Sequence, residues 1–282
     1  MANTDVILMG EAKEKPRPAQ IKQRRKMSGF ALALIAFLTF AFLYVPIFVL
    51  IFFSFNKAKT GSVWTGFTLD WYAAMFKNEA LIEALGNSLV IAISATLVSV
   101  VLGTLLAMAM ERYQFKSKPV WDGLLYMPVI IPEIVAGVSL LLFFATIQME
   151  RGLGTLIIAH VSFTTPFVYM TVRARLADFD RSVEEAAMDL GANELQTFFR
   201  ITLPMIMPGI ISGGLLAFTL SMDDFIISNF VKGVGGETLP VYVWPQLKRA
   251  VSPEINAAST MLLLFSIIIV VSSLILQQRQ KT

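Results

Sequence analysis

Six long stretches of this chain are almost free of charged side chains. The first of them, from Phe30 to Phe55, contains no charge at all. The others run from about Leu85 to Met110, Gly123 to Ile147, Gly152 to Val172, Met205 to Phe230 and Ile255 to Leu276. About 20 apolar helical residues cross a hydrocarbon core roughly 30 Å thick. The pattern therefore predicts an all-α membrane protein with six transmembrane helices.

The composition excludes several other classes of protein. Hydrophobic residues make up 56% of the 282 positions and charged residues only 15%, whereas soluble domains are about 25% charged. The absence of cysteine excludes disulfide frameworks and cysteine-based metal sites. With a single histidine, His160, we expect no metal site. The net charge of +3 is too balanced to indicate nucleic-acid binding.

Lysine and arginine residues predict the orientation of the spans. With the N-terminus inside, 16 of the 23 lie on the cytoplasmic side, which places both termini in the cytoplasm. The first stretch is too long for a cleavable signal peptide, so we expect a retained helix. The predicted organisation is a cytoplasmic tail over 1–29, a transmembrane domain over 30–276 and a short cytoplasmic tail over 277–282.

The longest polar segment on the predicted inside, residues 173–204, carries helical signals. Ser182 and Glu185 have the spacing of a capping box, and an apolar strip at helical spacing follows them. Gly191 is expected to end this first short helix, and a second short helix follows it. Such an elbow suits docking into a groove of another protein. A plain amphipathic hairpin lying against its own bundle fits the same pattern.

A gapped motif in this segment distinguishes between the two interpretations. Glu185-Ala186-Ala187, then Gly191, then Ile201 and Leu203-Pro204 resembles the EAA loop of ABC importer permeases. The resemblance implies a type I importer fold in which the segment forms coupling helices that dock onto a separate ATPase subunit. The coupling residues that it implies are Ser182, Glu184, Glu185, Ala186, Ala187, Gly191, Glu194, Ile201, Leu203 and Pro204.

Longer segments resemble the polyamine (spermidine and putrescine) branch of that family. They include EEAAMDLGA, ITLPMIMPGIISG, LLAFTLSMDDFIISNFV, GFTLDWY and VSPEINA, within residues 40–275. The resemblance implies a multi-pass subunit of a bacterial inner-membrane importer that works by alternating access. The implied partners are a second homologous permease, two ATPase subunits and an extracytoplasmic binding protein.

Other function classes lack the motifs that they need. No G-x4-G-K-[ST] sequence is present, so we expect the chain to bind no cofactor and a partner to use ATP and Mg²⁺. The chain also lacks G-x-S-x-G and GxGD motifs, which argues against a hydrolase or an aspartyl protease. A stand-alone secondary transporter or channel would suit acids inside the membrane, but would have no reason to carry an EAA loop.

Glu133 is the first candidate for the substrate pathway. It lies about ten residues into the third stretch, hence ~15 Å deep at 1.5 Å per residue. Pro128 and Pro132 precede it, and each removes one helical hydrogen bond. A carboxylate beside freed carbonyl groups would make a cation site. A protonated glutamic acid packed within the bundle is the alternative.

Asp223 and Asp224 are the second candidates, with Ser221 just before them. They lie in the outer part of the fifth stretch, where a polycation would gain charge-assisted hydrogen bonds. Adjacent positions on a helix point about 100° apart, so one of the two acids is expected to be structural. Solvation of both acids at the membrane surface is the alternative.

Trp71, within GFTLDWY, is the aromatic candidate because its ring suits cation–π contact with ammonium groups. Other tryptophan and tyrosine side chains in the outside loops, Trp244 included, fit the ordinary interfacial belt. His160 is expected to bond across helices, and Gly209 with Gly213 to allow close helix packing. The acids favour a cationic substrate, with another small cation or ferric iron as alternatives to a polyamine.

Overall fold

The computed structural model describes residues 18–59, 63–249 and 253–279, and these are helical apart from loops and one isolated antiparallel bridge between Asn56 and Phe67. The chain divides into two compact units, residues 1–53 and 54–282. The helices, in order, are α1 (Pro18–Ser54), α2 (Asp70–Lys77), α3 (Glu79–Arg112), α4 (Lys118–Ile130), α5 (Glu133–Thr146), α6 (Leu153–Ala177), α7 (Ser182–Asp189), α8 (Glu194–Thr197), the π-helical turn η1 (Phe198–Thr202), α9 (Leu203–Asp223), α10 (Ile226–Val231), α11 (Leu239–Arg249) and α12 (Pro253–Arg279).

Helix α1 forms most of the first unit. It begins at Pro18, earlier than the predicted span, and proline is well suited to a first helical position because its fixed φ matches the helix. The predicted N-terminal tail is therefore helical over 18–29. Residues 1–17 and 280–282, which hold the rest of the two predicted tails, lie outside the described residues.

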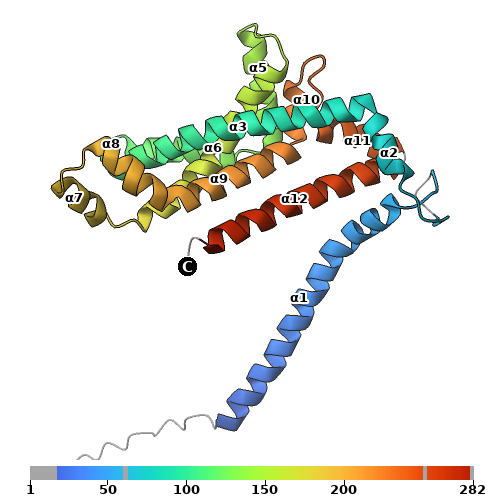
Figure 1. Ribbon diagram of the computed structural model, residues 1–282, viewed down its shortest axis with the longest axis horizontal. Helices are drawn as coiled ribbons and strands as arrows, with labels where there is room; N and C mark the ends of the chain where they lie inside the picture. The colour runs from blue at the N-terminus through green and yellow to red at the C-terminus, as the bar shows by residue number, and fades with distance from the viewer. Residues whose placement is uncertain (1–17, 60–62, 250–252, 280–282) are drawn as a thin grey trace, which may run out of the picture. The chain divides into compact units, whose positions relative to one another are not determined.

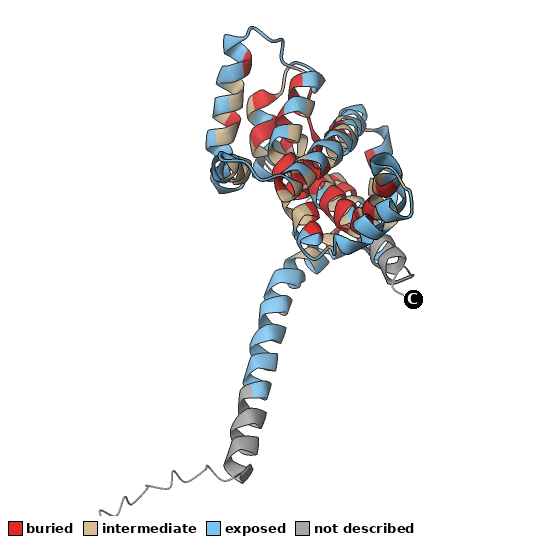
Figure 2. Cartoon of the chain, turned by 90° about the vertical axis from the view of Figure 1, so that its left-hand side faces the viewer, coloured by how far each residue is buried: buried red, intermediate tan, exposed pale blue. Residues whose placement is uncertain are grey.

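The second unit is built on α3, α6 and α9, which run alongside one another (Figure 1). Figure 2 shows buried residues concentrated where the helices of this unit meet. Two glycines let the helices approach closely. A Cβ on Gly103 would lie 2.8 Å from the Val168 side chain, and one on Gly213 would lie 3.1 Å from the Val168 backbone. The expectation that Gly213 serves helix packing is confirmed.

Four described helices are long and apolar enough to cross a membrane, over Gly29–Ser54, Glu79–Arg112, Leu153–Ala177 and Glu194–Asp223. Helices α4 and α5 qualify only as a pair, bent by 106°. A continuous third span is therefore the wrong expectation. Ile131 is extended because it precedes Pro132, which disfavours helical geometry at the residue before it. The predicted sixth stretch lies within α12.

The predicted fifth stretch is also broken. Helix α9 ends at Asp223, Asp224 is extended at φ −67° and ψ 118°, and the chain restarts as α10. The Asp224 carboxylate accepts hydrogen bonds from the Ile227 and Ser228 amides, which competes with helix continuation. Because the helix stops there, the expectation that both aspartates lie on one helix is wrong.

Helix α7 begins and ends by different devices. The predicted capping box is wrong: Arg181 is the N-cap and its carbonyl accepts the Glu185 amide, while the Ser182 amide donates to Asp180 at 3.0 Å. That bond lowers the pKa of the Asp180 carboxyl. The predicted end is confirmed, because Gly191 has φ +90° and its amide bonds the Met188 carbonyl in a Schellman turn.

The next helix begins with a capping box that the sequence analysis missed. The side chains of Asn193 and Gln196 each accept a hydrogen bond from the backbone amide of the other residue. From there α8, η1 and α9 form one continuous helix up to Asp223. The wider π turn stands just before Pro204, whose ring would otherwise clash with the carbonyl four residues earlier.

Candidate functional site

The two chain breaks, at 131–132 and 224–225, open onto one cavity of about 670 Å³. Residues of α4, α5, α6, α9, α10 and α11 line it. Among the described residues, the lining holds three carboxylates, Glu133, Asp223 and Asp224, and no lysine, arginine or histidine. The rest of the lining is mostly apolar and aromatic. The fold therefore brings Glu133 to the same cavity as Asp223 and Asp224, although they are about 90 residues apart in sequence.

The ends of the broken helices add to the negative potential of the cavity. The C-terminal ends of α4 and α9 contribute lining residues, and neither helix has a basic residue in its last turn. Carbonyl groups at a helix C-terminus carry a partial negative charge. The positive N-terminal ends of α5 and α10 are offset by Glu133 and Asp224 respectively. The cavity can thus hold a cation and disfavours an anion.

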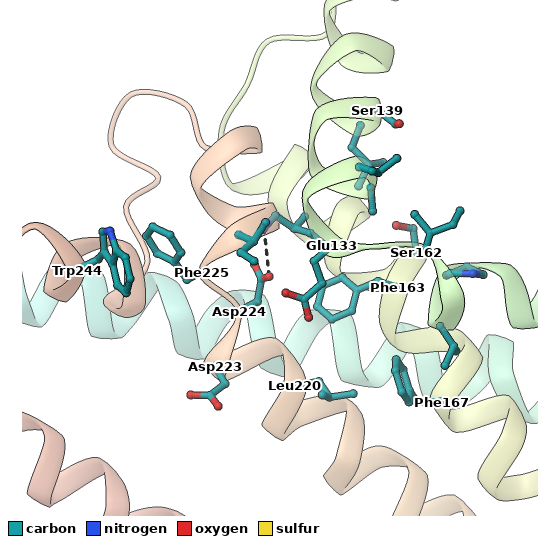
Figure 3. A pocket seen from close by; sticks show the side chains of 18 residues that line it. Glu133, Ser139, Ser162, Phe163, Phe167, Leu220, Asp223, Asp224, Phe225 and Trp244 are labelled. Atoms are coloured by element: carbon teal, nitrogen blue, oxygen red, sulfur yellow. Dashed lines mark hydrogen bonds between the residues drawn. The ribbon is translucent and has the colours of Figure 1, made fainter. Parts of the chain in front are cut away.

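Glu133 and Asp223 are the two acids that remain accessible. Glu133 is the first residue of α5 and is exposed, as is Asp223 at the end of α9. In Figure 3 the Asp223 carboxylate points away from those of Glu133 and Asp224. This arrangement does not direct all three carboxylates at one point. A long molecule with several separated charges is better matched to it.

Asp224 is engaged by the protein itself. Its side chain is 5% exposed, and its two oxygens accept the Ile227 amide at 3.2 Å and the Ser228 amide at 2.7 Å. His160 Nε2 lies 3.5 Å from one of these oxygens. The carboxylate therefore holds the restart of the chain at α10, and it lines the cavity from that fixed position.

His160 links three helices behind the cavity. Its Nδ1 lies 2.6 Å from the Ser221 hydroxyl of α9, and its Nε2 lies 3.0 Å from the Ser228 hydroxyl of α10. The ring is fully buried in α6, so the expectation that it bonds across helices is confirmed. Ser221 is placed here as well, bonded to His160 and absent from the cavity lining.

Trp71 lies apart from the cavity. It is in α2, where its indole Nε1–H donates to the Asn56 carbonyl at 2.7 Å, and it is not a lining residue. The aromatic side chains that do line the cavity include Trp244 and Phe225, whose ring centroids are 4.9 Å apart. Sequence reasoning assigned Trp244 to the membrane interface, because a single tryptophan in a loop carries no spacing signal.

The residues assigned to coupling lie together in the elbow, defined here as residues 182–204. Ser182, Glu185 and Ala186 of α7 are exposed, as are Gly191 and Glu194. Ala187, Ile201 and Leu203 are half-buried, and Pro204 is exposed near the start of α9. Large apolar side chains accompany them, with Leu190 90%, Leu195 70% and Phe199 60% exposed.

Glu184 differs from the other elbow residues because it is buried. Its carboxylate accepts hydrogen bonds from Arg112, the last residue of α3, and from the Thr202 hydroxyl of η1. Adjacent positions on a helix point about 100° apart, so α7 turns Glu185 outward while it turns Glu184 inward. Glu184 therefore bonds to other helices of this chain, whereas Glu185 is exposed on the outer surface of the elbow.

Comparison with known sequences identifies a family. Residues 99–281 match the profile of the binding-protein-dependent transport system inner membrane component. The putrescine transport system permease protein PotI of Escherichia coli K12 is 44% identical over 236 residues, covering 81% of this chain and 84% of the relative. The spermidine/putrescine transport system permease protein PotC of Haemophilus influenzae is 41% identical over 230 residues, covering 82% and 90%.

Solved structures share the fold at low sequence identity. A chain of a bacterial alginate ABC transporter, solved with its alginate-bound periplasmic protein, superposes with a TM-score of 0.68 over 90% of this chain and 94% of its own length, at 18% identity. A chain of an amino acid ABC transporter gives 0.56 over 75% and 99%, at 17% identity. The fold is therefore that of ABC importer transmembrane subunits.

Proposed function

This chain belongs to the family of inner membrane components of binding-protein-dependent transport systems, and we propose that it is the permease subunit of an ATP-driven polyamine importer. Its task is to carry spermidine or putrescine across a bacterial inner membrane by alternating access. The relatives named for polyamine transport support this substrate class, since each covers about four fifths of the chain. The subunit itself performs no catalysis.

The observation that carries the substrate class is the acidic cavity at the two chain breaks. Glu133 and Asp223 are exposed, lie in separate directions and have no cationic neighbour among the described lining residues. Each can accept a charge-assisted hydrogen bond from an ammonium group. The apolar and aromatic remainder of the lining suits the methylene segments between the amines. A polyamine supplies both features in one molecule.

The elbow supports the second half of the proposal, which is the coupling to ATP hydrolysis. Its exposed apolar side chains, Leu190, Leu195 and Phe199, form a surface suited to a groove on another protein. The partners in this proposal are two ATPase subunits that bind ATP and Mg²⁺, a second homologous permease and an extracytoplasmic binding protein. Movement of the ATPase dimer reaches the transmembrane helices through residues 182–204.

The membrane topology completes the proposal. The bent pair of α4 and α5 counts as one crossing and α12 as the sixth, with both termini on the cytoplasmic side. The elbow then faces the ATPase subunits. The distribution of lysine and arginine supports this orientation. The bend leaves backbone carbonyls beside Glu133, which is tolerated inside a membrane where they line a cavity.

Uptake of labelled spermidine and putrescine tests the function directly. Cells that lack this subunit but keep its partners are complemented with the wild-type chain or with Glu133→Gln/Asp223→Asn. We expect wild type to restore uptake. The double variant should lower it about tenfold or more at subsaturating substrate, since each lost charge-assisted hydrogen bond contributes about 1.5–3 kcal/mol. Glu150→Gln, an exposed acid outside the cavity lining, is the matched control.

The other outcomes separate the alternatives. Uptake of a different small cation or of ferric iron, without polyamine uptake, would keep the permease and change its substrate. Uptake that persists when the ATPase subunit is inactivated would instead identify a secondary transporter or channel. Equal polyamine uptake by wild type and the double variant would contradict the acidic cavity as the substrate site.

A further inference from the structure

We propose that Glu184 is the residue that holds the elbow against the transmembrane helices, and that the end of α3 connects it to a second ion cluster, which holds the start of α4. The inference rests on the proposed function in one respect, namely that the elbow receives movement from an ATPase subunit. It assigns to Glu184 a positioning role inside this chain, in contrast to a docking role for its exposed neighbour Glu185.

The contacts of Glu184 cross three separate elements. The carboxylate belongs to α7, the Arg112 guanidinium to α3 and the Thr202 hydroxyl to η1. Arg112 also reaches the Thr202 hydroxyl, at 3.5 Å. The Glu184 residue is only 9% exposed. The Arg112 side chain is 34% exposed, so the pair is buried only on the glutamate side. Removing the Arg112 or Thr202 donor would leave the largely buried Glu184 carboxylate with fewer partners, which favours keeping the three groups together.

None of these bonds is needed to form α7 itself. The helix begins with the Arg181 carbonyl and the Asp180 carboxylate, and it ends in the Schellman turn at Gly191. The bonds of Glu184 therefore fix where α7 sits and contribute little to whether it is a helix. Glu184 therefore acts as a positioning residue for α7.

A second ion cluster begins beside the first and extends it. Glu111, adjacent to Arg112 on α3, lies 3.7 Å from the Arg173 Nε of α6. Arg173 donates to Asp122 of α4 at 2.5 Å, and the Tyr169 hydroxyl donates to the same carboxylate at 2.7 Å. The side chain of Arg181, the residue just before the elbow, donates to the Glu111 carbonyl at 2.8 Å. The elbow is thus bonded to the same end of α3 that holds α6 and α4.

Helix α4 connects this cluster to the cavity. Asp122 lies near its start, while Pro128 and Val129 near its end, and Ile131 just after it, line the cavity. The distance along the helix from Asp122 to its last residue, Ile130, is about 12 Å at 1.5 Å per residue. A shift of the elbow that pulls on Arg112 can therefore displace one end of a rigid rod whose other end borders the substrate.

The test uses the complete complex, purified with its partners and reconstituted in liposomes with the binding protein inside the donor compartment. Three quantities are measured: ATPase subunit retained, ATP hydrolysed and labelled polyamine moved. For Glu184→Gln we expect normal retention, with polyamine moved per ATP lowered about tenfold, within the usual range of coupling between sites. Glu185→Gln should instead lower retention. Asp178→Asn, an exposed acid at the end of α6, is the matched control.

Thr202→Val provides a second, milder test, which decides the matter if the complex carrying Glu184→Gln does not assemble. It removes one donor to Glu184 while keeping the shape of the side chain, and a fall in polyamine moved per ATP is again expected. A wild-type ratio in Thr202→Val and Glu184→Gln, or a loss confined to ATPase retention, would overturn the inference. Failure of the wild-type complex to move polyamines at all would instead overturn the proposed function.

Discussion

At the scale of single residues, neighbouring acids in this chain have different tasks. Asp223 is exposed at the end of α9, whereas the side chain of Asp224 is buried and accepts hydrogen bonds from amides of α10. Glu185 faces outward and Glu184 inward in the same way. In both pairs the carboxyl groups are chemically alike. The path of the backbone determines which carboxyl group is exposed to solvent and which one accepts hydrogen bonds within the chain.

The two aspartates should therefore respond differently to the same substitution. Asp224→Asn leaves a single acceptor oxygen for two amides, so we expect a loss of about 1–2 kcal/mol, comparable to a lost helix cap. That corresponds to a fall of roughly 2–8 °C in the melting temperature of the purified protein. Asp223→Asn should leave the melting temperature unchanged while lowering uptake. Equal melting temperatures for the two variants would contradict the structural role of Asp224.

At the scale of elements, two helix breaks and one helix end shape the sites. Pro132 and Asp224 stop α4 and α9 beside the cavity, and Gly191 stops α7 within the elbow. A proline break follows from a missing donor and a steric clash. The Gly191 turn follows from a positive φ that other residues adopt only at a cost. These local rules place the ends of helices where carbonyls or exposed side chains are needed.

Gly191→Ala should weaken the docking of the elbow. An alanine at φ +90° costs about 1–2 kcal/mol, so the chain after α7 would open and displace the apolar surface of Leu190 and Leu195. We expect the purified complex to retain less ATPase subunit. Gly235→Ala is the matched control, since Gly235 has φ +75° and lies outside the elbow. A comparable loss of ATPase subunit in both variants would point to general destabilisation.

At the scale of the whole molecule, three long helices pack closely together. Shorter elements next to them contribute most of the cavity lining and most of the elbow. Helices α3, α6 and α9 share the largest buried cluster, which includes Ala107, Val168 and Ile206. The hydrophobic driving force between helices is weak in lipid. Close van der Waals packing at Gly103 and Gly213 therefore stabilises the association of these helices. Helix α9 connects the two sites, because the elbow runs into its start and Leu220 and Asp223 near its end line the cavity.

The packing predicts opposite effects for two alanine substitutions in one helix. A Cβ at Gly103 would lie 2.8 Å from Val168, so Gly103→Ala should cost about 1–3 kcal/mol through overpacking. Nothing lies within 4 Å of a Cβ at Gly86, so Gly86→Ala should leave stability unchanged or raise it by up to about 1 kcal/mol. Thermal unfolding in detergent measures both. A stable Gly103→Ala variant would argue against the close contact of α3 with α6.

The sequence by itself determined the features that depend on neighbours along the chain. Uninterrupted apolar length predicted the membrane class, and the positive φ required at Gly191 predicted the end of α7. The gapped pattern from Glu185 to Pro204 indicated the family that the comparisons then established. Each of these rests on local geometry or on the thickness of a bilayer, so no knowledge of the fold was required.

The tertiary structure alone decided which distant groups meet. Glu133 and Asp223 line one cavity because two helices break beside it. The sequence predicted lost hydrogen bonds at Pro128 and Pro132, but it predicted no break at Asp224. Trp244 joined the lining and Trp71 did not, while Glu184 turned inward to Arg112. The physical reason is that burial and ion pairing depend on distances across the fold. Spacing along one chain specifies which face a side chain occupies, but it does not specify what that face packs against.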